Sequence, residues 1–180
     1  MAAVSLAVNY VGGPTAVLEF GGLRFITDPA FDPPGGAYTT GPVTLHKTEA
    51  PAVEARDVEP LDVVLLSHDH HYDNLDHEGR ALLERARRVV TTAEGVRRLG
   101  SFATGLEPWQ KLRLGDVTIT ATPARHGPAD GDRGPVIGFV LEKAGAEGAV
   151  YGSGDTVWYE GVEGVARRYD VRYAVLLLGA

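Results

Sequence analysis

The stretch that most constrains this chain is a run of histidines and aspartates directly after an apolar strand. Residues 61–66 (Leu-Asp-Val-Val-Leu-Leu) predict a buried β-strand, and residues 67–76 (Ser-His-Asp-His-His-Tyr-Asp-Asn-Leu-Asp) follow it. Side chains two apart on an extended backbone point to the same side, so His68 and His70 can direct both rings at one ion. Imidazole and carboxylate are common zinc ligands. A solvated cluster is the alternative for a lone His-x-His pair, but the adjacent aspartates and the strand favour a metal site.

Composition limits what the rest of the chain can do. The 180 residues suffice for one domain with a core, over residues 1–180. There is no cysteine, so disulfides and thiolate metal sites are excluded, and any metal is held by nitrogen and oxygen. A net charge of −7, from 17 basic and 24 acidic residues, argues against extensive contact with nucleic acid or an anionic membrane.

The chain carries no recognisable targeting or membrane segment. No stretch approaches the roughly 20 apolar residues of a membrane span. The N-terminal residues 1–5 lack the basic region of a signal peptide. We therefore expect a cytoplasmic protein that acts on a small molecule, with no nucleic acid or membrane partner.

The first third of the chain predicts β-structure followed by a long loop. Strands are expected over residues 4–11, 15–20 and 23–27, the last two joined by a hairpin turn at Gly21-Gly22. Five of the eleven prolines fall within residues 28–53, which predicts an irregular segment. A flap facing the substrate and a solvated excursion are equally open interpretations of it.

Helices and strands alternate after the His/Asp loop. Asp76 predicts the N-cap of a helix that runs to about Arg88. The arginines of this helix could mark an anion site, but the interleaved acids favour a solvated face. The remaining expected elements are a strand over 89–91, a helix over 94–99, a hairpin over 112–122, strands over 136–142 and 149–152, a helix over 158–169 and an apolar strand of the buried type over 171–178.

Two further potential ligands also follow predicted strands. His126 stands after the 112–122 hairpin, and Asp155 stands after the 149–152 strand. Taken singly, His126 could be a structural histidine and Asp155 a turn residue. If the strand ends meet at one edge of the sheet, they join His68 and His70 as three imidazoles and a carboxylate, a set that closes a zinc site.

At these residues the sequence resembles the metallo-β-lactamase fold superfamily of metal-dependent hydrolases. The likeness is closest to the branch with the ascorbate-phosphate lactonase and the N-acylphosphatidylethanolamine phospholipase, and it runs from about Asn9 to the end. Its motifs are Thr27-Asp28-Pro29, Ser67-His68-Asp69-His70, Thr122-Pro123-Ala124-Arg125-His126 and Ser153-Gly154-Asp155-Thr156. The resemblance implies an α/β fold of the αββα sandwich type. It also implies that His68, His70 and His126 share one metal, with Asp155 as a bridging ligand.

Two departures from the family pattern concern its second metal. An inserted His71 displaces the loop, so that Asp73 matches the family's loop aspartate and Asn74 replaces a histidine. Either His71 substitutes as a ligand or that position is empty; counting without a gap would instead align Tyr72 and Asp73 with the family's aspartate and histidine. No histidine follows His126, and the family fold continues beyond the last strand, so the chain is expected to lack the C-terminal part. These departures predict one tightly held ion and a weak or absent second one.

The expected activity is hydrolysis by a zinc-activated water, with Mn²⁺ or Fe²⁺ as other ions, and the resemblance implies a lactone or a phosphoester as the substrate. Asp73 would orient that water or act as general base. Asp69 and Asp28 are expected behind the ligands, where they could orient a ring. The alternative function is a metal-binding protein with little or no hydrolytic activity; nucleic-acid processing is a third, which the net charge disfavours. A partly uncovered strand over 171–178 predicts self-association.

Overall fold

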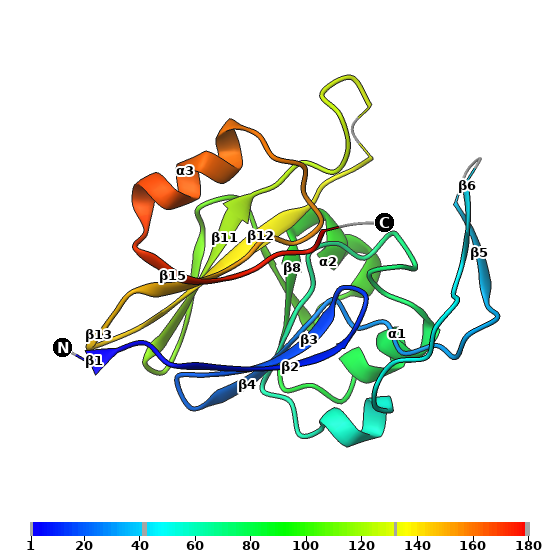
Figure 1. Cartoon of the computed structure of the whole chain (residues 1–180), viewed down its shortest axis with the longest axis horizontal. Helices are drawn as coiled ribbons and strands as arrows, with labels where there is room; N and C mark the ends of the chain where they lie inside the picture. Colours follow the sequence, from blue (N-terminus) through cyan, green and yellow to red (C-terminus); the bar gives the residue numbers. More distant parts are fainter. Residues whose placement is uncertain (1, 41–42, 132, 179–180) are drawn as a thin grey trace.

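The computed structural model describes residues 2–40, 43–131 and 133–178 and contains two β-sheets that pack face to face (Figure 1). The first is a six-stranded sheet in the order β2-β3-β4-β7-β8-β9. Its strands β2 to β4 are antiparallel, and β4, β7, β8 and β9 run parallel to one another. The strands are β2 (Leu6–Gly12), β3 (Thr15–Phe20), β4 (Leu23–Thr27), β7 (Val63–Leu65), β8 (Val89–Thr92) and β9 (Ala103–Leu106).

The second sheet has five strands in the order β10-β11-β12-β14-β15. All neighbours are antiparallel except β14 and β15, which are parallel. The strands are β10 (Lys111–Leu114), β11 (Val117–Pro123), β12 (Ile137–Lys143), β14 (Ala149–Gly152) and β15 (Val171–Val175). Two small pairs lie outside these sheets: β1 (Ala2–Ala3) with β13 (Ala146–Glu147), and β5 (Ala37–Thr40) with β6 (Val43–His46).

The helices are short and lie on the outer faces of the two sheets. Helix α1 (His77–Leu83) and helix α2 (Ala93–Leu99) pack on the six-stranded sheet, and helix α3 (Glu160–Arg168) packs on the five-stranded sheet (Figure 1). A 3-10 turn, η1 (Ala55–Val58), precedes β7. The order helix, sheet, sheet, helix is the αββα sandwich that the resemblance predicts, and that prediction is confirmed. None of the helices in the described part of the chain has the length and apolar character that a membrane span needs.

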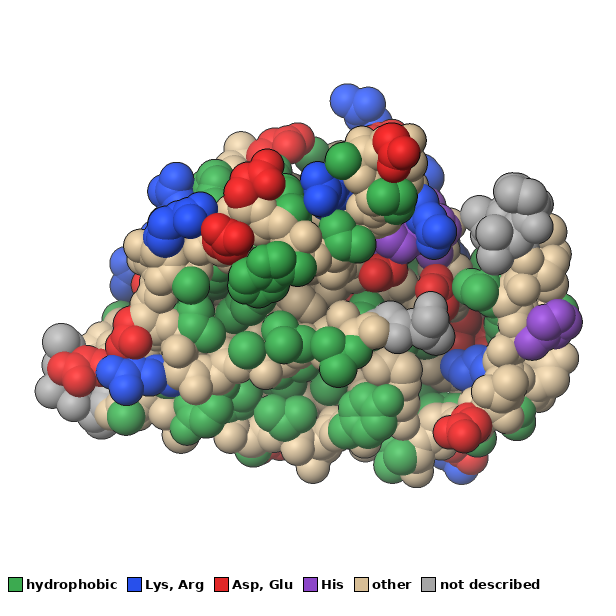
Figure 2. Space-filling view, turned by 45° about the horizontal axis from the view of Figure 1, so that its top comes forward, with side chains coloured by type: hydrophobic (Ala, Val, Ile, Leu, Met, Phe, Trp, Pro, Cys, Tyr) green, Lys and Arg blue, Asp and Glu red, His purple; other side chains and the backbone are tan. Residues whose placement is uncertain are grey.

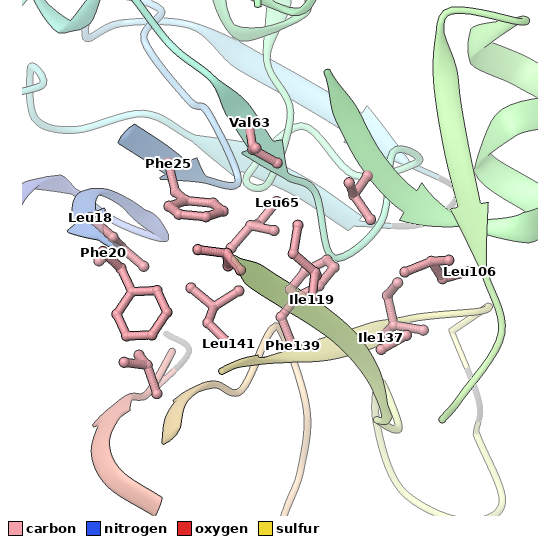
Figure 3. Close-up of a cluster of buried hydrophobic side chains, with 14 of the residues drawn as sticks. Leu18, Phe20, Phe25, Val63, Leu65, Leu106, Ile119, Ile137, Phe139 and Leu141 are labelled. Carbon is pink, nitrogen blue, oxygen red and sulfur yellow. The ribbon is translucent and has the colours of Figure 1, made fainter. Parts of the chain in front are cut away.

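The main core lies between the two sheets. Phe25 and Leu65 from the six-stranded sheet contact Ile119, Phe139 and other residues of the five-stranded sheet (Figure 3). Smaller apolar clusters fill the space under α1 and α2 and under α3. Alternating strand positions supply this core, because every second side chain of a strand points to the same face.

Several predicted boundaries are wrong, and the reason is tertiary contact. The predicted 76–88 helix ends at Leu83, because the residues after it pair with β7 and the segment before it. The Arg87 N–H donates to the Leu61 carbonyl, and the Val64 N–H donates to the Arg88 carbonyl. Strand β9 is missing from the prediction. Residues 28–53 are not irregular throughout, since they contain the β5–β6 hairpin.

The last strand is also not of the buried type that its apolar sequence predicts. Strand β15 ends at Val175, and its Tyr173 is 43 % exposed. The strand forms the outer edge of the five-stranded sheet, so that it has one neighbouring strand in the described residues. Leu176 and Leu178 beyond it are exposed. The apolar run therefore predicted the strand correctly but did not predict that it would lie exposed at the edge of the sheet.

Candidate metal centre

The His/Asp loop starts from a position that is fixed by both sheets. Ser67 and His68 are fully buried. The Ser67 N–H donates to Asp28 Oδ1 at 2.6 Å, and the Ser67 carbonyl accepts from the Ile137 N–H at 3.1 Å. Asp28 follows β4 of one sheet, and Ile137 begins β12 of the other. The first histidine of the loop is thereby held at the seam between the sheets.

One group of candidate ligands combines residues that are distant in the sequence. His68, His126 and Asp155 each offer a ligand atom, and these atoms lie within 4.8 Å of one another. His126 follows β11 and is buried, while Asp155 follows β14 and is half-buried. The His126 Nε2 to Asp155 Oδ2 distance is 2.8 Å, and the His68 and His126 ring centroids are 5.1 Å apart. The structure thus brings together candidate ligands from three separate segments.

A second group lies within the loop and shares one member with the first. The ligand atoms of His68, His70 and His71 also lie within 4.8 Å of one another. His68 Nε2 is 3.1 Å from His71 Nδ1, and the His71 ring centroid is 4.8 Å from that of His126. The inserted His71 therefore points toward the other histidines. Four imidazoles and one carboxylate surround the same region.

The hydrogen bond of His70 determines which ring nitrogen is free. Its Nε2 is 2.9 Å from the backbone carbonyl oxygen of Arg133. A carbonyl only accepts, so Nε2 carries the proton and Nδ1 keeps its lone pair. Among the described residues, this buried Nδ1 has no hydrogen-bond partner, nor has the buried Nδ1 of His126. Buried polar atoms are normally paired, so the unpaired Nδ1 of His70 within this histidine cluster fits a bound metal ion.

The protonation states of the cluster also fit a metal. Burial, assisted by the neighbouring imidazoles, lowers the pKa of His68 to about 2. Burial lowers the pKa of His71 to about 4. Both rings are consequently neutral near pH 7, and the neutral ring is the form that binds a metal. Burial raises the pKa of Asp155, while the nearby His126 opposes that rise.

The residues aligned with the family's second metal are arranged differently. Asp73 is exposed and belongs to neither group of candidate ligands in the described chain. Its charge nevertheless raises the pKa of both His71 and Asp155. Asn74 is buried, and its Nδ2 donates to Ser67 Oγ at 3.3 Å. The amide therefore contacts the base of the loop.

Asp69 and Asp28 both contact groups behind the candidate ligands. Asp28 accepts a hydrogen bond from the Ser67 N–H, and Ser67 Oγ lies 3.0 Å from His68 Nδ1, so Asp28 is connected to the His68 ring through Ser67. Asp69 points away from the cluster, and both of its oxygens accept hydrogen bonds from Arg98 of α2, at 2.7 and 2.6 Å. Arg98 was not identified from the sequence, because nothing local links α2 to the loop. Burial raises the pKa of Asp28 to about 7, partly opposed by its hydrogen bonds to Ser67.

A second connection joins the loop to the β5–β6 hairpin. The Tyr38 hydroxyl donates to Asp32 Oδ2 at 2.7 Å, and His77 Nδ1 lies 2.8 Å from the same oxygen. The Tyr38 ring stacks on Tyr72 of the loop, with centroids 5.0 Å apart. Figure 2 shows a hollow between the hairpin and the body of the molecule, with charged side chains in it. The hairpin thus lies beside the His/Asp loop and contacts it through the stacking of Tyr38 on Tyr72.

Two stacked sheets with outer helices and a histidine-rich cluster at one end define the metallo-β-lactamase class of fold. Residues 23–178 match the Beta-lactamase superfamily domain, and the chain belongs to that superfamily. A UPF0173 metal-dependent hydrolase of Pyrobaculum islandicum is 28 % identical over 191 residues, which cover 97 % of this chain and 72 % of the relative. The family predicted from the motifs is confirmed.

Two solved structures show the same fold. The isothiocyanate hydrolase from Delia radicum gut bacteria has a TM-score of 0.81 and 22 % identity, over 96 % of this chain and 71 % of its own. A metallo hydrolase from the archaeon Ignicoccus hospitalis has a TM-score of 0.69 and 21 % identity, over 94 % of this chain and 69 % of its own. The family is thus one of metal-dependent hydrolases, and the present chain contains a His/Asp cluster suited to a metal.

Proposed function

We propose that this chain hydrolyses a lactone or a phosphoester with one tightly held zinc ion. The residues that would hold the ion are His68, His70, His126 and Asp155. The observation that carries the proposal is the approach of ligand atoms from three chain segments to within 4.8 Å of one another. A zinc ion there would supply Lewis acidity, which polarises a carbonyl or phosphoryl group and makes water more acidic.

The protein's own residues supply the remaining functions of the site. The Arg133 carbonyl holds His70 in the tautomer that leaves Nδ1 free. His71 is directed at the same region and stands beside the ligand set. Asp73, exposed at the edge of the cluster, orients the attacking water or accepts its proton. Replacing Asp73 by Asn is expected to lower kcat by about 10²-fold while metal content stays constant.

Metal binding with little or no hydrolytic activity is the second candidate function. The observation that favours it is Asn74, whose amide contacts Ser67 and supplies no ligand for a second ion. Metal content and turnover separate the two candidates. A protein that holds zinc but hydrolyses no lactone, phosphodiester, β-lactam or isothiocyanate would support the second one. The isothiocyanate is included because a protein of the same fold is named for that activity.

Elemental analysis of purified protein tests the proposal directly. Wild type is expected to hold one equivalent of zinc, and His126→Ala is expected to lose it together with activity, because His126 connects the five-stranded sheet to the site. His46→Ala is the matched control, since His46 is an exposed histidine at the end of β6. Wild type without stoichiometric metal, or a His126→Ala variant with unchanged metal content, would contradict the proposal.

A further inference from the structure

Beside the histidine cluster lies a cavity of about 430 Å³ that the proposed mechanism does not use. Two candidate ligands, His70 and His71, form part of its wall, so a molecule in this cavity would lie next to the metal-facing rings. The other lining residues are Asp69, Tyr72, Leu75, Asp76, His77, Arg80 and Arg98. The wall is therefore rich in charged groups, and their pairing determines which ligand fits.

Both carboxylates of the wall are already neutralised by partners. Asp69 is buried and accepts two hydrogen bonds from Arg98. Asp76 is buried, accepts from Lys47 Nζ at 3.0 Å and caps α1 by accepting from the Gly79 N–H at 2.8 Å. Neither carboxylate is free to attract a cation into the cavity.

Arg80 is the unbalanced charge of this wall. One of its guanidinium nitrogens donates a hydrogen bond to the backbone carbonyl of Asp69, at 3.1 Å. No ion pair joins Arg80 to a carboxylate within the described residues. The contact fixes the guanidinium against the peptide between the two ligand histidines and leaves its other N–H donors available. A guanidinium presents five N–H donors in a planar fork that matches carboxylate and phosphate oxygens.

A second positively charged side chain, that of Arg133, also lies near the histidines. Arg133 provides the carbonyl that binds His70, and its charge lowers the pKa of both His71 and Asp155. Basic side chains lie next to the histidines on this face of the molecule (Figure 2). Arg80 and Arg133 thus place two positive charges beside the histidines, although the whole chain carries a net charge of −7.

We propose that this cavity is a subsite for an anionic group of the substrate, a carboxylate or a phosphate, held by Arg80. The inference rests on the proposed function for its link to catalysis and narrows the substrate class to anionic molecules. It also separates Arg80 from the other arginines of the predicted 76–88 helix: Arg80 faces the cavity, whereas Arg85 pairs with Glu59 and Arg87 with Asp62.

Isothermal titration calorimetry on metal-free protein tests the subsite without any need for turnover. Inorganic phosphate and glutarate are the two probes, and binding of either or both to wild type distinguishes a phosphate from a carboxylate preference. Arg80→Gln is expected to weaken the binding by at least about tenfold, since a hydrogen bond to a charged group is lost. Arg80→Lys should retain part of it, because it keeps the charge without the fork.

Arg97→Gln is the matched control, because Arg97 is an exposed arginine of α2 outside the cavity wall. Its binding should stay within about twofold of wild type, and thermal melting of each variant checks that it folds. No saturable binding to wild type, or an Arg80→Gln variant that binds both probes as wild type does, would overturn the proposal.

A kinetic measurement on the zinc-loaded protein extends the test. The anionic ester mono-(4-nitrophenyl) glutarate is compared with the neutral 4-nitrophenyl acetate. Arg80→Gln is expected to lower the ratio of their kcat/KM values by about tenfold, and Arg97→Gln is expected to leave it unchanged. Absence of turnover for both esters would count against the proposed hydrolysis, while the calorimetry would still decide whether the anion subsite exists.

Discussion

The two halves of the His/Asp loop are held very differently. Residues 67–69 are buried and connected to both sheets and to α2, through Asp28, Ile137 and Arg98. Residues 71–73 are half-buried or exposed, and their side-chain contacts include the approach of His71 to His68 and the stacking of Tyr72 on Tyr38. The difference teaches that this protein fixes the start of the loop, with the candidate ligand His68, firmly, while the part of the loop that resembles the family's second metal site is less restrained.

The largest effect on stability is expected from breaking the Asp69–Arg98 pair. Arg98→Met leaves the Asp69 carboxylate buried without a cation, which should cost roughly 3 kcal/mol of unfolding free energy. Arg97→Met on the same helix should cost less than about 0.5 kcal/mol. Urea unfolding measures both. Equal stability of the two variants would remove the claim that this pair anchors the first half of the loop.

The pH dependence of stability tests the other anchor, Asp28. Its pKa rises from 3.8 to about 7 on folding, so between these values the folded chain binds a proton that the unfolded chain has released. The contribution of Asp28 to stability therefore falls as the pH rises through this window, by up to about 1.4 kcal/mol per pH unit. Asp28→Asn cannot titrate, so its stability relative to wild type should increase with pH over the same window.

Comparison with this variant is necessary because His68 and His71 act in the opposite direction. Their pKa values are lowered on folding, so their contributions to stability rise as the pH increases toward 6.5. Urea unfolding of metal-free wild type and Asp28→Asn at several pH values isolates the contribution of Asp28 to the pH dependence of the unfolding free energy. Parallel pH curves for the two proteins would mean that Asp28 is not the buried, proton-binding anchor described above.

The smallest effect is expected at Asn74, the buried residue that directly follows residues 71–73. Asn74→His restores the residue type that the resemblance expects, but the side chain at this position contacts Ser67. We expect zinc content to stay at one equivalent and stability to fall by about 1 kcal/mol, the usual value of a lost hydrogen bond. Asn74→Ala is the matched control for the stability term. A rise to two equivalents of zinc in Asn74→His would show that the two halves differ by a single residue and not in their anchoring.

The alternation of apolar residues was sufficient to predict most of the strands, and the four motifs were sufficient to predict the αββα sandwich. Strand β9 was missed because Gly105 interrupts its short pattern. A Cβ at Gly105 would lie 2.7 Å from the Ala93 backbone, so the glycine reflects close packing against α2. The β5–β6 hairpin was missed because prolines flank it, and its pairing with the loop through Tyr38 and Tyr72 is not local.

The candidate site was predictable as a set of residue types but not as an arrangement. Nothing in the sequence indicates that the Arg133 carbonyl selects the tautomer of His70, or that Arg98 of α2 holds Asp69. Both contacts join residues that are far apart in the sequence, by 63 and 29 positions. The orientation of the inserted His71 likewise depends on residues that are distant in the sequence, such as His126.

The ligands of the candidate site come from both sheets: His68 follows β7 of one, and His126 and Asp155 follow strands of the other. An ion bound there would connect the two sheets, because its ligands would come from both of them. Only the folded chain offers this bridge, so zinc at about 100 times its dissociation constant would add about 2.7 kcal/mol to the unfolding free energy. The midpoint of thermal melting would then depend on the zinc concentration of the buffer. Chelating agents used during purification would lower the unfolding free energy of the whole fold.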